Sequence, residues 1–139
     1  MPDLYTATAT ATGGRTGRIR SSDGVLDESL AMPKEIGGAG GDATNPEQLF
    51  AAGYAACFEN ALRRVARERK APITESSVTA HVTLARGEDG YFKLSTVLEI
   101  SVPGRDKTDV EAMARTAHEE VCPYSHATRG NMPVEVRVV

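Results

Sequence analysis

The sequence predicts a mixed α+β fold, and three observations support this prediction. Segments in which apolar and polar residues alternate with a period of two, as in half-buried strands, lie at 4–12, 78–84 and 92–102. Two segments with helical periodicity, 46–70 and 108–121, separate them or follow them. The order of strands, helix, hairpin, helix and strand lacks the βαβ alternation that builds a parallel sheet, which makes α+β the expected class.

The N-terminal strands are separated by turn signals. The strand at 4–12 ends at the turn GGRTGR, and strands are expected at 18–22 and 25–32. Asp23-Gly24 between these two is a favoured hairpin turn. We therefore expect a small antiparallel sheet at the start of the chain.

The helix at 46–70 is expected to be central to the fold. It follows the glycine-rich connector EIGGAGGDATNP, in which Asn45 can cap the helix and Pro46 can occupy its first position. Its first half is apolar nearly all round, so it must be buried on several sides. The connector also spells Gly38-x-Gly40-x-x-Ala43, but without a βαβ unit this is not a dinucleotide site.

The second half of the chain predicts a long antiparallel hairpin, a helix and a last strand. The hairpin joins 78–84 to 92–102 through a turn at Asp89-Gly90. The helix has the capping-box pattern Thr108-x-x-Glu111 and must stop before Pro123. PVEVRVV at the end reads as a strand.

Length and composition indicate a single soluble domain over residues 1–139. The chain is 40% hydrophobic and 25% charged, which is ordinary for a globular protein. No secretory signal or long apolar run occurs, so we expect a cytoplasmic protein with no membrane partner. In a reducing compartment, a bond between its two cysteines would be transient rather than structural.

Cys57 and Cys122 are the candidate chemical groups. A free cysteine has a pKa near 8.5, so only about 3% is thiolate at pH 7, and a reactive Cys57 needs a cation to overcome the effect of burial. Arg15 in GGRTGR is the candidate, because flanking glycines let the backbone turn sharply. Glu47 is its candidate partner, although an acid in a first helical turn is also expected for the helix dipole.

Geometry restricts how these groups can meet. Ten residues of helix rise about 15 Å, so Glu47 cannot touch the sulfur of Cys57 on one unbroken helix. Either Arg15 bridges between them, or the relevant Glu47 comes from a partner subunit. Cys122 precedes Pro123, which favours a hinge, and it can act as a resolving thiol if its Cα lies within about 4.4–6.8 Å of that of Cys57. From spacing alone, it can equally be a small apolar residue that closes a helix.

A metal site is not expected. The two cysteines and the three histidines show no CxxC or HxxxH spacing. His81 and His118 read as residues of exposed faces, and His126, near Cys122, is the histidine of most interest. The basic run at 63–70 ends a helix, where cations favour the dipole, and no aromatic residues are interleaved with it, so nucleic acid is not an expected partner.

Four separated segments resemble the Ohr/OsmC family of organic hydroperoxide resistance proteins: TATATGGRTGR, SSDGVLD, GGAGGDATNPEQLFAAGYAACF and VCPYSHATRGN. They occur in the family's order and span nearly the whole chain. The resemblance implies an OsmC-like intertwined homodimer, with antiparallel sheets wrapped around central helices and active sites at the subunit interface. It implies an enzyme that reduces organic hydroperoxides to alcohols.

The resemblance also assigns roles to residues. Cys57 in AACF matches the peroxidatic thiol and Cys122 in VCPYS the resolving one, while Arg15 and Glu47 match the activating pair. It implies that a sulfenic acid on Cys57 is captured by Cys122 as a disulfide. Dithiols such as dihydrolipoyl groups on lipoylated proteins would reduce that disulfide, with no metal, haem, flavin or other cofactor.

An apolar entrance would select alkyl or lipid hydroperoxides. Each buried methylene contributes about 0.8 kcal/mol, so four give about 3 kcal/mol, a preference of roughly a hundredfold over hydrogen peroxide. The residues expected to line it are Leu26, Met32, Ile36, Phe50 and Tyr54. Two alternatives stay open on the residues alone: a non-enzymatic thiol redox sensor or small-molecule-binding module, and a structural domain with inert cysteines.

Overall fold

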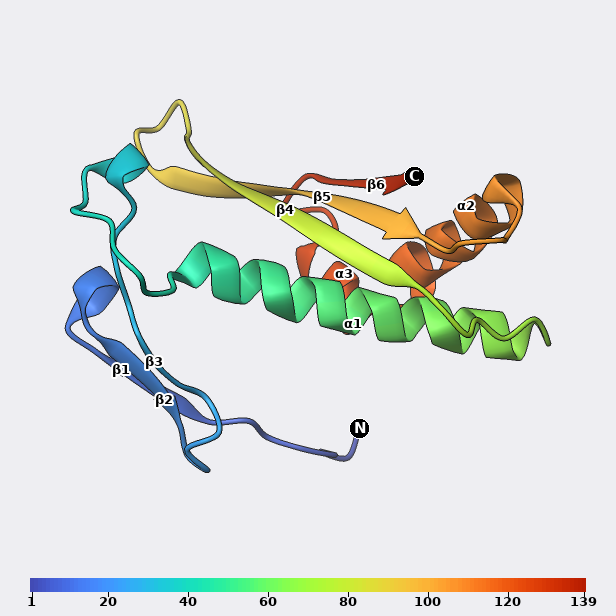
Figure 1. The fold of residues 1–139 in the computed structure, drawn as a ribbon, viewed down its shortest axis with the longest axis horizontal. Helices are drawn as coiled ribbons and strands as arrows, with labels where there is room; N and C mark the ends of the chain where they lie inside the picture. The colour runs from blue at the N-terminus through green and yellow to red at the C-terminus, as the bar shows by residue number, and fades with distance from the viewer. The chain divides into compact units, whose positions relative to one another are not determined.

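The computed structural model describes residues 1–139. It contains six strands, which form two three-stranded sheets, and three α-helices. The chain divides into two compact units, Met1–Leu49 and Phe50–Val139 (Figure 1). The α+β class predicted from the sequence is confirmed, while the single domain over 1–139 stays a prediction. None of the helices combines the length and apolar character that a membrane-spanning segment requires.

The first unit carries the N-terminal sheet, of order β1-β2-β3 and antiparallel throughout. Its strands are β1 (Ala9–Thr12), β2 (Arg18–Ser21) and β3 (Asp27–Ser29), and short 3-10 turns lie at Gly14–Thr16 and Lys34–Ile36. The predicted strand starting at residue 4 was wrong over its first half, because residues 4–8 have no assigned strand partner.

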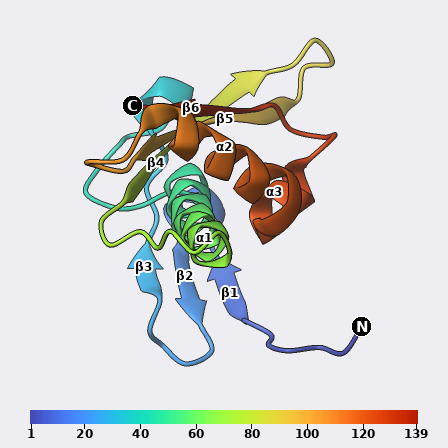
Figure 2. The same cartoon turned by 90° about the vertical axis from the view of Figure 1, so that its right-hand side faces the viewer.

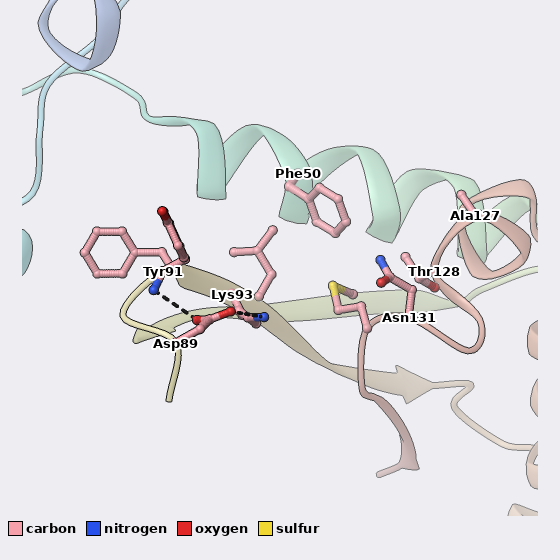
Figure 3. Close-up of a pocket in the computed structure, with 10 residues that line it drawn as sticks. Phe50, Asp89, Tyr91, Lys93, Ala127, Thr128 and Asn131 are labelled. Carbon is pink, nitrogen blue, oxygen red and sulfur yellow. Dashed lines mark hydrogen bonds and ion pairs between the residues drawn. The ribbon is translucent and has the colours of Figure 1, made fainter. Parts of the chain in front are cut away.

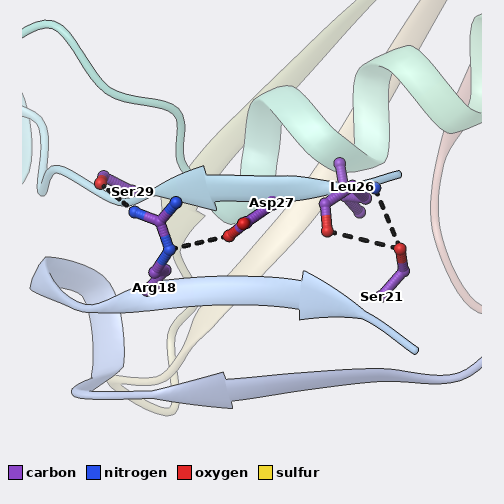
Figure 4. A network of polar contacts seen from close by, with 5 residues as sticks. All are labelled: Arg18, Ser21, Leu26, Asp27 and Ser29. Atoms are coloured by element: carbon purple, nitrogen blue, oxygen red, sulfur yellow. Dashed lines mark hydrogen bonds and ion pairs between the residues drawn. The ribbon is translucent and has the colours of Figure 1, made fainter. Parts of the chain in front are cut away.

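The β2–β3 hairpin of this unit is held by polar contacts at the surface (Figure 4). Arg18 donates from Nε to Asp27 at 2.8 Å and from Nη1 to the hydroxyl of Ser29 at 3.0 Å. Ser21 closes the other end, where its hydroxyl accepts from the N–H of Leu26 at 3.0 Å. Exposed contacts of this kind contribute little each. Leu30, 8% exposed, is the only buried residue in the unit, so the sheet has almost no core of its own.

The second unit is built on α1 (Pro46–Glu68), whose first turn belongs to the first unit. The other elements are β4 (Ser77–Arg86), β5 (Phe92–Ser101), α2 (Lys107–Thr116), a π-helical turn (Ala117–Val121), α3 (Pro123–Thr128) and β6 (Val134–Val138). Figure 2 looks along α1 and shows the sheet, α2 and α3 grouped around one side of the helix.

A single hydrophobic core fills this unit. Tyr54, Phe58 and Leu62 of α1 are each 0% exposed. They belong to one cluster with Leu98 and Ile100 of β5 and with residues of α2 such as Val110 and Met113. In the first half of α1 only Tyr54 is buried, while Ala52 and Ala56 are exposed, so the predicted burial of this half on several sides is not seen within the chain.

The last strand corrects the prediction that no parallel pairing occurs. β6 pairs with β5 in parallel, from Thr96 opposite Val134 to Ile100 opposite Val138. The chain leaves β5, returns through α2 and α3, and re-enters the sheet in the same direction, which is a βαβ crossover. The β4–β5 hairpin is antiparallel as predicted, from Ser77 opposite Ser101 to Arg86 opposite Phe92.

Two helix boundaries also differ from the sequence prediction. The cap of α2 is Asp106, whose carboxylate accepts from the N–H of Asp109 at 3.2 Å, so the predicted capping box at Thr108 was wrong. The helical segment does stop before Pro123, but a further helix, α3, starts at that proline. A proline in a first helical turn costs no hydrogen bond, so it can begin a helix as well as end one.

Candidate active site

The structure brings together the two cysteines, which are 65 residues apart in the sequence. The sulfurs of Cys57 on α1 and Cys122 at the start of α3 lie 3.7 Å apart, and both thiols are free. Cys122 is 1% exposed, whereas Cys57 is partly accessible. A disulfide bond is about 2.05 Å long, so a small movement of either side chain closes the gap.

The backbone around Cys122 explains how a thiol is presented at this point. The residue follows the π-helical turn and has an extended conformation, with φ −68° and ψ 119°, as expected before a proline. Its N–H still donates to the carbonyl of Ala117 at 2.8 Å, and its carbonyl accepts from the N–H of His126 at 2.9 Å. π-Helical turns often occur at functional sites.

An aromatic cluster packs beside the dithiol. The rings of Phe50, Tyr54 and Tyr124 have centroids 5.7 to 6.2 Å apart. Gly53 makes this packing possible, because a Cβ at that position would lie 2.6 Å from the hydroxyl oxygen of Tyr124. The glycine in the middle of α1 therefore lets the Tyr124 ring approach the helix one turn before Cys57.

Within the second unit, the surroundings of Cys57 favour the protonated thiol. Burial raises the pKa of Cys57 above its ordinary value, and the neighbouring Cys122 raises it further, while a hydrogen bond from the backbone N–H of Tyr124 partly offsets both effects. No cationic side chain of this unit acts on the sulfur. A reactive thiolate therefore needs a positive charge from outside Phe50–Val139.

Arg15 and Glu47 form a bidentate ion pair within the first unit. Nη1 of Arg15 donates to Oε2 of Glu47 at 2.8 Å, and Nη2 donates to Oε1 at 2.6 Å. Hydrogen bonding to Arg15 lowers the pKa of the Glu47 carboxyl, and burial only partly opposes this shift. The carboxylate is thus held ionised, and it fixes the direction of the guanidinium.

The glycines around Arg15 and the cap of α1 position this pair. A Cβ on Gly17 would lie 1.7 Å from the carbonyl oxygen of Thr12, so only glycine permits this turn. Glu47 stands in the first turn of α1, whose cap is Asn45, as predicted, with its side chain accepting from the N–H of Gln48 at 2.8 Å. The backbone at Arg15 is therefore constrained by a turn that requires glycine, and the backbone at Glu47 by the capped start of α1.

Sequence reasoning missed a set of buried polar groups next to Cys122. Nδ1 of His118 lies 2.7 Å from the hydroxyl of Ser125, which lies 2.8 Å from the hydroxyl of Tyr54. Burial lowers the pKa of His118, so the imidazole is neutral at pH 7. The prediction that His118 lies on an exposed face was wrong. His126 is exposed, and His81 is exposed as predicted.

The predicted pocket residues are distributed over both units. Phe50 lines a cavity of about 560 Å³ in the second unit together with Tyr91, Leu94 and Met132 (Figure 3). Tyr54 does not line it, because its side chain is 0% exposed. The other three belong to the first unit: Leu26, which is 38% exposed, and Met32 and Ile36, which are partly buried. No three potential metal ligands gather anywhere in the chain.

Comparisons with known proteins define the class. Residues 38–137 match the family model described as OsmC-like protein. An organic hydroperoxide resistance protein of Xanthomonas axonopodis pv. citri is 54% identical over 132 residues, which cover 94% of this chain and 92% of that protein.

Solved structures agree with this class. The crystal structure of an organic hydroperoxide resistance protein from Legionella pneumophila has a TM-score of 0.93 and 50% identity, and the match covers 99% of this chain and 98% of that one. OhrB of Bacillus subtilis has a TM-score of 0.92 and 46% identity, with 99% and 100% covered. The chain belongs to the OsmC-like family and, within it, to the organic hydroperoxide resistance proteins.

Proposed function

We propose that this protein is a cysteine-based peroxidase that reduces organic hydroperoxides to alcohols as part of an oxidative stress response. The observation that carries the proposal is the pair of free sulfurs 3.7 Å apart in the core of a chain whose close relatives are named for organic hydroperoxide resistance. Two reduced thiols supply two electrons, which is what reduction of one peroxide consumes. No metal, flavin or haem is needed for this balance.

In the first step, the thiolate of Cys57 attacks one oxygen of the substrate ROOH. The O–O bond breaks, the sulfur gains a hydroxyl to become a sulfenic acid, and the leaving alkoxide takes up a proton to give the alcohol ROH. The partly accessible position of Cys57, compared with the fully buried Cys122, supports its role as the sulfur that meets the substrate.

In the second step, the sulfur of Cys122 attacks the sulfenic sulfur of Cys57. An S–S bond forms, the S–O bond breaks, and the hydroxyl leaves with the Cys122 proton as water. The starting separation of 3.7 Å supports this assignment, because no large rearrangement is needed.

Arg15 and Glu47 are proposed as the activating pair. The environment of Cys57 within its own unit raises the thiol pKa, so the cation must come from elsewhere. Arg15 suits this role for two reasons. The pKa of Glu47 is lowered, so this carboxylate stays charged and holds the Arg15 guanidinium in a fixed direction. The Arg15 side chain also remains 31% exposed. A guanidinium can also donate to a peroxide oxygen.

The cycle closes when an external dithiol, such as a dihydrolipoyl group on a lipoylated protein, reduces the disulfide. Attack through Cys57 is favoured because Cys122 is buried. A cytoplasmic location remains a prediction that suits thiols kept reduced at rest. The first unit has almost no buried residues of its own, which supports the proposed intertwined homodimer.

Substrate preference follows from apolar burial. The rings of Phe50 and Tyr124 and the cavity at Phe50 offer apolar surface to an alkyl chain. With about 0.8 kcal/mol for each buried methylene, a hydroperoxide that buries four is preferred roughly a hundredfold over hydrogen peroxide. The predicted contacts at Leu26, Met32 and Ile36 remain proposals.

The deciding experiment follows the mass of the reduced protein after one equivalent of cumene hydroperoxide. We expect loss of two hydrogens within seconds, a Cys57–Cys122 crosslink in the peptide map, and one equivalent of alcohol. Turnover should then continue when dihydrolipoamide is added, and it should be slower with glutathione. A protein that loses two hydrogens but does not turn over with any dithiol would instead be a redox sensor, and one that keeps its mass and consumes no peroxide would be a binding module or a structural domain.

A further inference from the structure

The turn that carries Cys122 is fastened on both sides. His118 lies four residues before the cysteine and Ser125 three residues after it, and Nδ1 of His118 lies 2.7 Å from the Ser125 hydroxyl. This hydrogen bond closes a loop around Cys122 across the junction between the π-helical turn and α3. The loop fixes how far the cysteine can swing.

The same hydroxyl fastens the turn to the helix that carries Cys57. The Ser125 hydroxyl lies 2.8 Å from that of Tyr54, which in turn lies 3.3 Å from the hydroxyl of Thr128. Tyr54 precedes Cys57 by three residues, about one helical turn. The network therefore joins the turn that carries Cys122 to the helix that carries Cys57, and none of its hydrogen bonds goes to either sulfur.

Burial makes this network rigid. Tyr54 and Ser125 are each 0% exposed, and Thr128 is 7% exposed. The Thr128 hydroxyl also donates to the carbonyl of Ser125 at 3.2 Å. With a neutral imidazole at its end, every hydroxyl has a partner whichever ring nitrogen carries the proton, so the network is satisfied without any charge.

The second chemical step depends strongly on position. The Cys122 sulfur must approach the Cys57 sulfur from 3.7 Å to bonding distance, from the side opposite the departing hydroxyl. Misplacement of a reacting group by about 1 Å can slow a reaction by roughly a hundredfold. A turn that drifts away would leave the sulfenic acid waiting and open to further oxidation.

We propose that Tyr54, Ser125 and His118 are positioning residues for disulfide formation, holding the Cys122 turn against α1 so that the resolving sulfur stays within reach of Cys57. This inference rests on the proposed peroxidase function. It assigns the network to the second step alone, because Tyr54 and Ser125 are fully buried and no member of the network is hydrogen-bonded to the Cys57 sulfur.

The test separates the two steps in a rapid-mixing experiment. Tyr54→Phe combined with Ser125→Ala removes both central hydroxyls and keeps the aromatic ring in place. We expect peroxide consumption in the first turnover to match the wild type, while disulfide formation slows about tenfold. Trapping with dimedone should then capture more sulfenic acid, and excess peroxide should yield more sulfinic acid on Cys57.

Matched variants guard against a general loss of structure. Thr96→Val removes a buried hydroxyl that has no hydrogen-bond partner and lies in β5, outside the network, and it should leave both steps unchanged. His118→Asn keeps a hydrogen-bonding atom near the position of Nδ1, so it should resolve faster than His118→Leu. Tyr54→Phe alone provides a milder variant if the double substitution fails to fold.

The outcomes distinguish this inference from the proposed function. If the wild type forms no disulfide with peroxide, the peroxidase proposal itself is lost. If the wild type forms it and Tyr54→Phe/Ser125→Ala does so at the same rate, only the positioning role is overturned. Equal slowing of both steps would also overturn it, because the network would then serve the fold in general.

Discussion

The two units of this chain carry different groups of the proposed peroxidase. The second unit buries the dithiol in a dense core, where the pKa of Cys57 is raised. The first unit has one buried residue, yet it carries an ion pair with a directed guanidinium. The core brings the two sulfurs close together, and in the proposed function the turn that carries Arg15 supplies the positive charge. We therefore expect that a substitution at Arg15 can remove the activation of the thiol without changing the arrangement of the two cysteines.

The largest effect is expected from the dithiol. Cys57→Ser should abolish turnover, since the other free thiol of the second unit, Cys122, is only 1% exposed and does not meet the substrate. Cys122→Ser should allow one equivalent of alcohol and then stall as a sulfenic acid, detectable by dimedone and mass spectrometry. Residual multiple turnover in the Cys57→Ser protein would show that the nucleophile is misassigned.

Removal of the Arg15 side chain should have the next largest effect. An ordinary thiol with a pKa near 8.5 is about 3% thiolate at pH 7, whereas one near 6 is about 90% thiolate. Because burial raises the pKa of Cys57 above the ordinary value, Arg15→Ala should slow peroxide reduction at pH 7 by roughly 30-fold or more. The alkylation of Cys57 by iodoacetamide should then shift its midpoint to higher pH, toward the raised value that burial imposes.

The control for this experiment is Arg18→Ala, which removes an exposed arginine of the same unit that is paired with Asp27. It should leave the alkylation profile in place. An Arg15→Ala profile that overlaps the wild type would mean that another group activates the thiol.

The turn that carries Arg15 offers a third test. Because a Cβ on Gly17 would meet the carbonyl of Thr12 at 1.7 Å, Gly17→Ala must displace backbone. We expect peroxide reduction to fall several-fold to tenfold, with disulfide formation within the second unit unaffected once the sulfenic acid exists. Gly37→Asn is the matched control, because Gly37 has φ +94° but open space around it, and asparagine tolerates a left-handed backbone. Comparable losses in both variants would show that the turn has no special role.

The sequence was sufficient for the features that depend on local chemistry. Asn45 and Pro46 mark the start of α1, and Asp89-Gly90 marks the β4–β5 turn, because caps and turns are set by the residues that form them. The direction of β6 could not be predicted in this way, since its own residues fit either pairing and the path through α2 and α3 decides.

The wrong prediction of an exposed His118 has the same cause, because the path of the chain decides what covers this residue. The sequence pattern does not predict α3, because a proline fits the position after a helix as well as the first turn of one. Ser125 of α3 is the residue that partners the imidazole. The closeness of Cys57 and Cys122 was required by the resemblance to known peroxidases, but the spacing of the two residues left it open. It depends on α3 folding back onto α1, as the contact between Tyr54 and Ser125 shows.

The smallest effect should appear in the pH dependence of stability. Arg15 lowers the pKa of Glu47 in the folded chain, so the pair stabilises the fold fully above the unfolded carboxyl pKa near 4.3 and loses this contribution as the pH falls through the lowered value. Glu47→Gln should therefore lose about 0.5–1 kcal/mol at pH 7 relative to the wild type, and the gap should close toward pH 3. Urea unfolding at several pH values measures this difference. A gap that stays constant with pH would mean that shape, and not charge, holds the two side chains together, and the first unit would then lose its role as the source of a directed cation.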